Sequence, residues 1–208
     1  ELDPNYATAR QWYAEYLTSS GQFDEALVQI GRAQELEPMS MIIRSVWGWI
    51  LLCAGRTDAA VQQLEGTVEM GPDFVTARWF LGQAYARKGQ LGRAAVQLEE
   101  AARLSSRSPR ILADLGHVYA LAGQREKAVE ILRSFDQAGA KRQFVSPYAR
   151  AVLHAGLGNR DQAFTALDEA LEGGLWEVVT LKVDPMLVSL HEDPRFRRLV
   201  RRVGLASD

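Results

Sequence analysis

The residues best able to support catalysis are three histidines and one cysteine, and they are scattered along the chain. His117, His154 and His191 lie far apart, and none has a second histidine at the spacing of a zinc motif such as H-E-x-x-H. Cys53 has no neighbouring base in the sequence that would activate its thiol. The glycines form no phosphate-binding loop. These patterns predict a protein that is not an enzyme and that holds no metal and no cofactor.

Composition excludes several other classes of function. The 208 residues carry a formal net charge of -2, which gives no overall attraction to nucleic acid or to an anionic membrane. The longest apolar stretch, around residues 46–54, is far shorter than the roughly 20 residues of a membrane-spanning helix. A single cysteine excludes an intrachain disulfide and is typical of a reducing compartment. The expected location is therefore the cytoplasm.

A 34-residue period runs through most of the chain. Glycines recur at that spacing, and a fifth copy follows after 35 residues: Gly21, Gly55, Gly89, Gly123 and Gly158. An alanine comes five residues after each glycine, and a leucine or isoleucine four residues later: Ile30, Leu64, Leu98, Leu132 and Leu167. Such a period is typical of a stack of one supersecondary unit, in which each copy buries its apolar face against its neighbours.

Each repeat is predicted to be an antiparallel pair of helices. In residues 75–108, apolar side chains fall at helical spacing both before and after Gly89, and a glycine can adopt the left-handed conformation that ends a helix. A small residue seven positions before each glycine would let the helices approach closely. Pro38 and Pro72 end their second helices. Because Pro4 stands 34 residues before Pro38, the chain is expected to be a fragment of a longer protein.

The segments "LGQAYARKGQLGRAA" and "LGHVYALAGQREKAV" resemble the tetratricopeptide repeat (TPR) pattern of a small residue, an aromatic, a glycine and an alanine within 34 residues. The resemblance implies an all-α fold, a right-handed superhelical stack (α-solenoid) of about five hairpins whose concave face binds peptides or protein segments. The expected domains are a TPR array and a C-terminal capping segment: residues 1–172, with repeats at about 7–40, 41–74, 75–108, 109–142 and 144–174, and residues 175–208.

The resemblance also implies which side chains would line the concave groove. They are Gln11, Glu15, Ser45, Trp49, Trp79, Gln83, Arg87, Arg110, His117 and Tyr148. Trp49 and Trp79 are either binding anchors or core residues, since tryptophan at helical spacing fits both. Arg87 and Arg110 favour an acidic ligand or a C-terminal carboxylate. The predicted function is a protein-interaction scaffold for a peptide or protein segment, and the alternative is self-association into homo-oligomers.

Arg10, Arg44 and Arg78 form a second series at the 34-residue spacing. They are expected to form a ladder along the stack. The ladder could bind an acidic partner, or it could pair with nearby carboxylates such as Glu37 and Asp73. Local pairing is the favoured interpretation.

The last 34 residues leave the period and predict two short helices. Asp184 and Asp193 each precede a proline, which is the pattern of an N-cap followed by the first helical residue. The second helix has one apolar stripe, which is expected to dock on the end of the stack: Phe196, Leu199, Val200 and Val203. Its arginines offer a less favoured alternative, contact with nucleic acid.

The same region carries a narrower resemblance. Segments "FVSPYARAVLHAGLGNRDQAF", "LKVDP" and "EDPRFRRLVRRVGL" are similar to the C-terminal ends of bacterial multidomain signalling proteins. In those proteins a TPR array follows an effector such as a winged-helix DNA-binding domain or a kinase domain. The resemblance implies the regulatory part of a larger signalling protein, whose ligand could be its own upstream effector.

Overall fold

The computed structural model describes residues 6–140 and 143–205, and every regular element in these residues is a helix. Eleven α-helices and two short 3-10 helices follow one another in this part of the chain. Their bounds are α1 Ala7–Ser19, α2 Phe23–Leu36, α3 Met41–Cys53, α4 Thr57–Met70, α5 Val75–Arg87, α6 Leu91–Leu104, α7 Pro109–Leu121, α8 Arg125–Ala140, α9 Pro147–Leu157, α10 Arg160–Glu172, η1 Trp176–Thr180, η2 Pro185–Leu190 and α11 Pro194–Val203. None of these helices is both long and apolar enough to cross a membrane.

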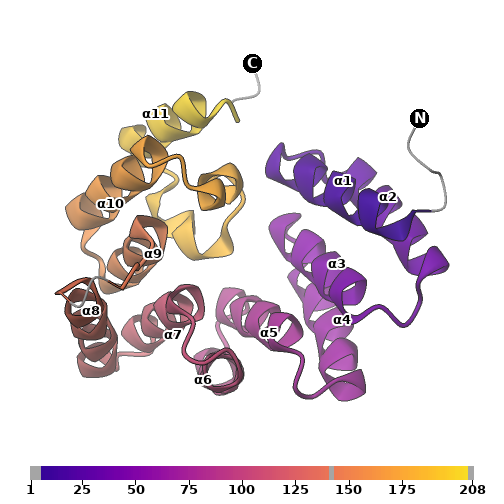
Figure 1. Ribbon diagram of the computed structural model, residues 1–208, viewed down its shortest axis with the longest axis horizontal. Coiled ribbons are helices and arrows are strands. Elements are labelled where there is room, and N and C mark those ends of the chain that lie inside the picture. Colours follow the sequence, from indigo (N-terminus) through magenta and orange to yellow (C-terminus); the bar gives the residue numbers. More distant parts are fainter. Residues whose placement is uncertain (1–5, 141–142, 206–208) are drawn as a thin grey trace.

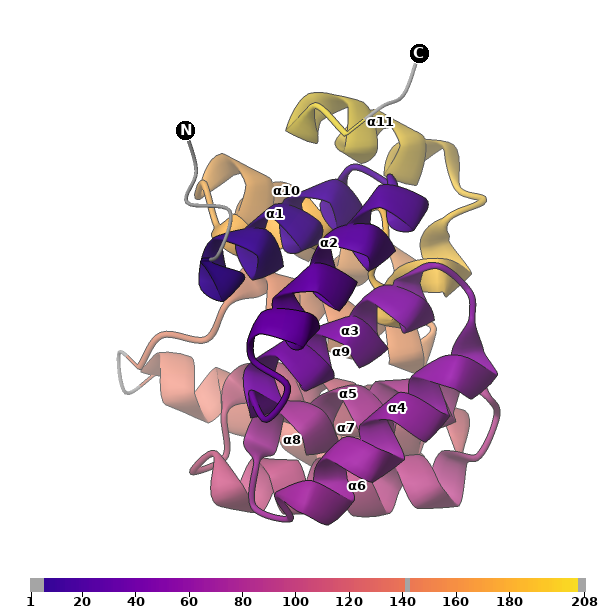
Figure 2. The same ribbon diagram turned by 90° about the vertical axis from the view of Figure 1, so that its right-hand side faces the viewer.

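The α-helices pack in consecutive pairs, from α1 with α2 to α9 with α10, and the pairs follow one another round an arch (Figure 1). Turned by 90°, the first three pairs are seen stacked one below another (Figure 2). The predicted helical solenoid is thus confirmed. In the first four pairs the odd-numbered helix supplies the inner side of the arch, so these helices carry the candidate groove.

The hinge glycines adopt the conformation that the repeat pattern predicts. All five have a positive φ, between 75° and 83°, at the turn between the two helices of a pair. The backbone N–H of the following residue reaches back into the first helix, as Gln90 does to the carbonyl of Tyr85 at 2.9 Å. Each pair is therefore closed by a left-handed turn that a side chain with a Cβ would strain.

Small residues let the two helices of a pair come close. A Cβ at Gly82 would lie 2.5 Å from Cγ of Leu98, and a Cβ at Gly48 would overlap Cγ of Leu64. The leucine of the repeat thus fills the space that the glycine leaves, which explains why the small residue and the leucine recur together along the period.

The fourth pair departs from this arrangement. A Cβ at Gly116 would overlap Cδ1 of Leu153 in α9, and Leu132, which the period aligns with Leu98, is only partly buried. Gly156 of α9 brings that helix against α7, since a Cβ there would lie 2.5 Å from Cα of His117. The close approach in this part of the stack is between α7 and α9 and not within the pair of α7 and α8.

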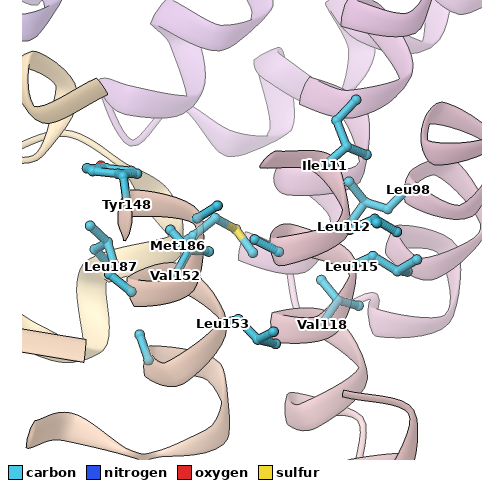
Figure 3. Close-up of a cluster of buried hydrophobic side chains, with 14 of the residues drawn as sticks. Leu98, Ile111, Leu112, Leu115, Val118, Tyr148, Val152, Leu153, Met186 and Leu187 are labelled. Atoms are coloured by element: carbon cyan, nitrogen blue, oxygen red, sulfur yellow. The ribbon is translucent and has the colours of Figure 1, made fainter. Parts of the chain in front are cut away.

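The C-terminal segment does more than extend the end of the stack. Helix α11 packs on α10, with Phe196 and Leu199 buried, but η1 and η2 lie inside the arch (Figure 1). Met186 and Leu187 of η2 pack beside Tyr148 and Val152 of α9 (Figure 3). Sequence reasoning placed the whole segment at the end of the array. The apolar residues of η2 are instead buried against the inner surface of α9 and α5.

Candidate functional site

The concave face contains a buried group of charged and polar side chains centred on Asp114 of α7. Asp114 is fully buried, and its Oδ2 accepts hydrogen bonds from Nε1 of Trp79 and from Nε2 of Gln83, each at 2.6 Å. Its Oδ1 accepts from the guanidinium of Arg110, one helical turn earlier. Burial raises the pKa of Asp114, while the positive charge of Arg110 opposes that rise. These three donors satisfy the hydrogen-bonding capacity of both oxygens of the buried carboxylate.

Arg110 also connects this group to the C-terminal segment. Its Nη2 lies 2.8 Å from Oδ2 of Asp184, which also accepts a hydrogen bond from the hydroxyl of Tyr148 at 2.9 Å. The other oxygen of Asp184 caps η2 by accepting from the backbone N–H of Met186 at 2.8 Å. Although burial works against it, the carboxylates of Asp114 and Asp184 raise the pKa of Arg110. The guanidinium therefore stays charged between two carboxylates.

This arrangement corrects the expected role of the two groove arginines. Arg110 is engaged by Asp114 and Asp184 and has no charge left over for an acidic ligand. Arg87 is exposed and lies in a different hollow, beside Lys182 and His191. The sequence pattern could not reveal either fact, because one of the carboxylates that engage Arg110 comes from 74 residues away.

Several other expected groove residues are covered. Tyr148 and Ser45 are fully buried, and Gln11 is 6% exposed. His117 is buried between α7 and α9, where its Nδ1 lies 2.9 Å from the carbonyl oxygen of Val152. Tyr148 is covered by η2. These side chains support the inner wall of the arch and do not offer a surface to a ligand.

The remaining predicted residues meet in one open pocket of about 190 Å³, which we call the tryptophan pocket. The structure brings together predicted residues of the first four repeats, apolar neighbours, and side chains of the C-terminal segment. Its lining consists of Glu15, Ile42, Val46, Trp49, Thr76, Trp79, Phe80, Gln83, Arg110, Trp176, Glu177, Thr180, Asp184 and Pro185.

Stacked aromatic rings form one wall of the tryptophan pocket. Phe80 stacks on Trp49 with ring centroids 6.0 Å apart, and on Trp79 with centroids 5.1 Å apart. Trp79 is held in place by its hydrogen bond to Asp114. On the C-terminal segment, Trp176 is 73% exposed. Trp49 and Trp79 are half-buried and also line the pocket. Each therefore packs partly against the protein and leaves part of its ring open to a ligand.

The acidic and amide groups of the pocket are its second feature. Gln11 donates to Oε1 of Glu15 at 2.9 Å, and burial raises the pKa of that carboxyl above its ordinary value. Gln83 is 2% exposed and uses its Nε2 on Asp114, which leaves its Oε1 without a hydrogen-bond partner among the described residues. That amide orientation follows from chemistry, because an ionised carboxylate only accepts.

Sequence reasoning missed the five lining residues that follow α10. They are Trp176, Glu177, Thr180, Asp184 and Pro185. Asp184 was recognisable as a helix cap, but only its second carboxylate oxygen shows that it also holds Arg110. Pro185 was recognisable as the first residue of that helix, but no pattern in the sequence signals Trp176, Glu177 or Thr180, because they stand outside the 34-residue period.

Two arginines of the 34-residue series make side-chain hydrogen bonds within their own pair of helices. Arg10 and Arg78 donate to Gln29 and Gln97, at 2.9 Å and 2.8 Å. In both cases the glutamine lies 19 residues downstream, on the second helix of the same pair. Arg10 and Arg78 therefore link the two helices of the first and third pairs.

In the last helix, two of the arginines bind carboxylates of α10. Arg195 lies 2.7 Å from Asp161 and stacks over the ring of Phe164, and Arg202 pairs with Asp168. These contacts fasten α11 to the stack. Among the described residues, no group of three histidine, cysteine, aspartate or glutamate side chains could hold a metal ion.

Comparison with known proteins agrees with the repeat geometry. Residues 46–109 and 109–134 match family models described as tetratricopeptide repeat. Residues 46–134 are therefore similar to tetratricopeptide repeats. These two stretches hold most of α3, all of α4 to α7 and most of α8, and so include the parts of the helices that carry Trp49, Trp79 and Arg110. None of the curated proteins compared with the chain matches it in sequence.

Solved structures share the TPR fold at low sequence identity. A thermophilic TPR protein of Thermus thermophilus is 23% identical with a TM-score of 0.64, and the match covers 96% of this chain and 98% of that one. A chain of the Cut9–Hcn1 complex of APC/C is 16% identical with a TM-score of 0.63, and the match covers 97% of this chain and 43% of that one. MamA is 22% identical with a TM-score of 0.52, covering 80% and 90%.

Proposed function

We propose that the protein is a non-catalytic scaffold that binds a peptide or protein segment on its concave face. TPR repeats bind peptides or proteins, which supports this class of function. The observation that carries the proposal is the tryptophan pocket, where Trp49, Phe80 and Trp79 stack in an open hollow. Aromatic side chains are enriched among the residues that dominate binding energy. Burial raises the pKa of the Cys53 thiol, which supports a non-catalytic role for that residue.

The proposal is tested by selecting binders from a displayed library of random peptides. Individual selected peptides are then titrated against the parent chain and against Trp49→Ala. Loss of a central aromatic anchor is expected to weaken binding by about 2 kcal/mol, roughly 30-fold in Kd. Far-UV circular dichroism checks that the variant keeps its helices.

Trp12→Ala is the matched control, because Trp12 is also a tryptophan of a first helix but lies outside the pocket. Its peptide affinities should equal those of the parent. A selection that yields no binders, or binders that ignore Trp49 and respond to Trp12, would contradict the proposal.

The wider biological role is also a proposal. The chain acts as the cytoplasmic regulatory part of a larger bacterial signalling protein, with a peptide or the effector domain of the same protein as its ligand. The support is the resemblance of the C-terminal segments to such proteins and the single cysteine. Contact with nucleic acid is disfavoured, since Arg195 and Arg202 already pair with carboxylates of α10.

Self-association is a second candidate, supported by the open face of α1. Trp12 and Tyr16 are 61% and 63% exposed, whereas Ile50 and Ala84, which stand one and two periods after Tyr16, are fully buried. Sedimentation equilibrium of the parent and of a Trp12→Ser, Tyr16→Ser double variant tests this candidate. An oligomer that the double variant dissociates would support it, and a monomeric parent at all concentrations would exclude it.

A further inference from the structure

The tryptophan pocket presents hydrogen-bond acceptors and negative charge. Glu15, Glu177 and Asp184 contribute carboxylates to its lining. Among the described residues that line the pocket, Arg110 is the only cation, and it is already held by Asp114 and Asp184. The two buried carboxylates of Asp114 and Asp184 already outweigh the single positive charge of Arg110. Glu15 and Glu177 add further negative charge. The net charge of the pocket and its supports is negative.

A second, independent feature also calls for a donor. Oε1 of Gln83 is buried without a hydrogen-bond partner among the described residues, and Gln83 lines the pocket. A buried acceptor that makes no hydrogen bond costs free energy that a ligand donor would recover. Burial also raises the pKa of the Glu15 carboxyl. A ligand cation nearby would stabilise the charged form of that carboxyl.

The aromatic wall completes the chemistry. The faces of tryptophan and phenylalanine attract a cation within about 6 Å of the ring centroid. The same wall already shows this preference, since the guanidinium of Arg110 lies 5.4 Å from the ring of Trp79. At about 190 Å³ the pocket is smaller than the roughly 300–1,000 Å³ typical of drug-sized ligands, and its size suits one side chain.

From these features we infer that the tryptophan pocket receives the arginine or lysine side chain of a basic segment of a partner protein. The cationic head lies among Glu15, Glu177 and Oε1 of Gln83, and the aliphatic stem lies along the aromatic wall. Trp176 and Ile42, two exposed residues of the pocket lining, offer apolar contact to the residues on either side of the basic side chain. This inference rests on the proposed scaffold function and replaces the acidic ligand expected from Arg87 and Arg110.

The test uses blocked amino acids as probes. Nα-acetyl methylamides of arginine and lysine are compared with those of citrulline and norleucine, which keep the shape of each stem without the charge, and with that of glutamate. Binding is read from the NMR signals of the indole N–H groups of Trp49, Trp79 and Trp176, each assigned by a Trp→Phe variant. The basic probes are expected to bind at least about tenfold more tightly than their neutral matches, a difference of about 1.4 kcal/mol.

Variants locate the charge that selects the ligand. Glu15→Gln and Glu177→Gln should each weaken binding of the arginine probe several-fold and leave the citrulline probe unchanged. Glu126→Gln, on the exposed first turn of α8, is the matched control and should change neither. n-Butylammonium distinguishes a free amine from a side chain, and it should bind more weakly than the blocked lysine.

Each contrary outcome has a distinct meaning. If the neutral or acidic probes bind the pocket as tightly as the basic ones, the cation inference is overturned while the scaffold proposal stands. If n-butylammonium binds as tightly as the blocked lysine, the pocket is a site for free amines and the partner segment is overturned. If no probe shifts the indole signals, the inference fails, and the peptide selection with Trp49→Ala decides the scaffold proposal separately.

Discussion

At the scale of single residues, burial sets the ionisation behaviour of the histidines. His117 is buried against α9 and contacts the carbonyl oxygen of Val152. Burial lowers its pKa from an ordinary 6.5, and it lowers the pKa of His154 and His191 as well. All three are therefore neutral in the folded protein at pH values where the unfolded chain already binds protons.

We predict that the free energy of unfolding falls as the pH drops below about 6.5, because the unfolded state then binds more protons than the folded state. His117→Gln keeps an N–H donor for Val152 but cannot titrate. It should flatten the slope of stability against pH by up to about 1.4 kcal/mol per pH unit. Urea unfolding between about pH 5.5 and pH 8 measures this, a range that spans the ordinary histidine pKa.

His154→Gln is the comparison, since His154 is less buried and should change the slope less. Buried carboxyls such as Glu15, whose pKa is raised, increase the free energy of unfolding as the pH falls further, which is the opposite effect. They are present in the parent and in each variant, so their contribution cancels when the two slopes are subtracted. Equal slopes for His117→Gln and the parent would show that His117 titrates in the folded state as it does in the unfolded one.

At the scale of elements, the repeat depends on how closely two helices of a pair approach. Gly82 of α5 and Gly66 of α4 both lie inside helices, where alanine is intrinsically favoured over glycine. They differ in their surroundings. A Cβ at Gly82 would lie 2.5 Å from Leu98, whereas a Cβ at Gly66 would meet nothing within 4 Å.

The same substitution should therefore have opposite effects at these two glycines. Gly82→Ala is expected to destabilise by about 1–3 kcal/mol, because the added methyl group overpacks the contact with Leu98. Gly66→Ala should stabilise by about 0.5–1 kcal/mol through helix propensity alone. Urea unfolding of both variants measures the difference, and a shift of the same sign in both would refute the close-packing explanation.

At the scale of the whole molecule, the C-terminal segment joins repeats that a simple solenoid keeps apart. In a solenoid each repeat contacts only its neighbours. The stability of one repeat therefore affects that of a distant repeat only through the repeats that lie between the two. Here η2 contacts both α9 and α5, and Asp184 holds Arg110 and Tyr148 on two different helices. The arch should unfold more cooperatively than its repeats alone would.

Leu187→Ala tests this coupling. Leu187 of η2 is fully buried, and its truncation is expected to cost about 2–5 kcal/mol. Hydrogen exchange should become faster not only in α9 but also in α5, which is distant in the sequence. Leu121→Ala is the control, because Leu121 is 53% exposed and should change stability by less than about 0.5 kcal/mol. Faster exchange confined to η2 and α9 would show that the segment does not link the repeats.

Much of the fold could be predicted from the chain itself. The glycine period placed the hairpin turns, and the small residue seven positions before each glycine indicated a close approach of the helices, which the second and third pairs show. These features are local, since each repeat carries its own turn and its own packing residues. Even so, the fourth pair follows different contacts, because Gly156 brings α9 against α7 and Leu153 takes the space beside Gly116.

The candidate site was only half predictable. The resemblance to TPR proteins implied that Glu15, Trp49 and Trp79 lie on the concave side, and all three line the pocket. The sign of the pocket's charge could not be read from it, because Arg110 meets a carboxylate that lies 74 residues away and outside the period. A repeating pattern determines how each helix packs on its neighbour. Which charges are paired and which stay available depends on where a non-repeating segment comes to rest, and only the tertiary structure decides that.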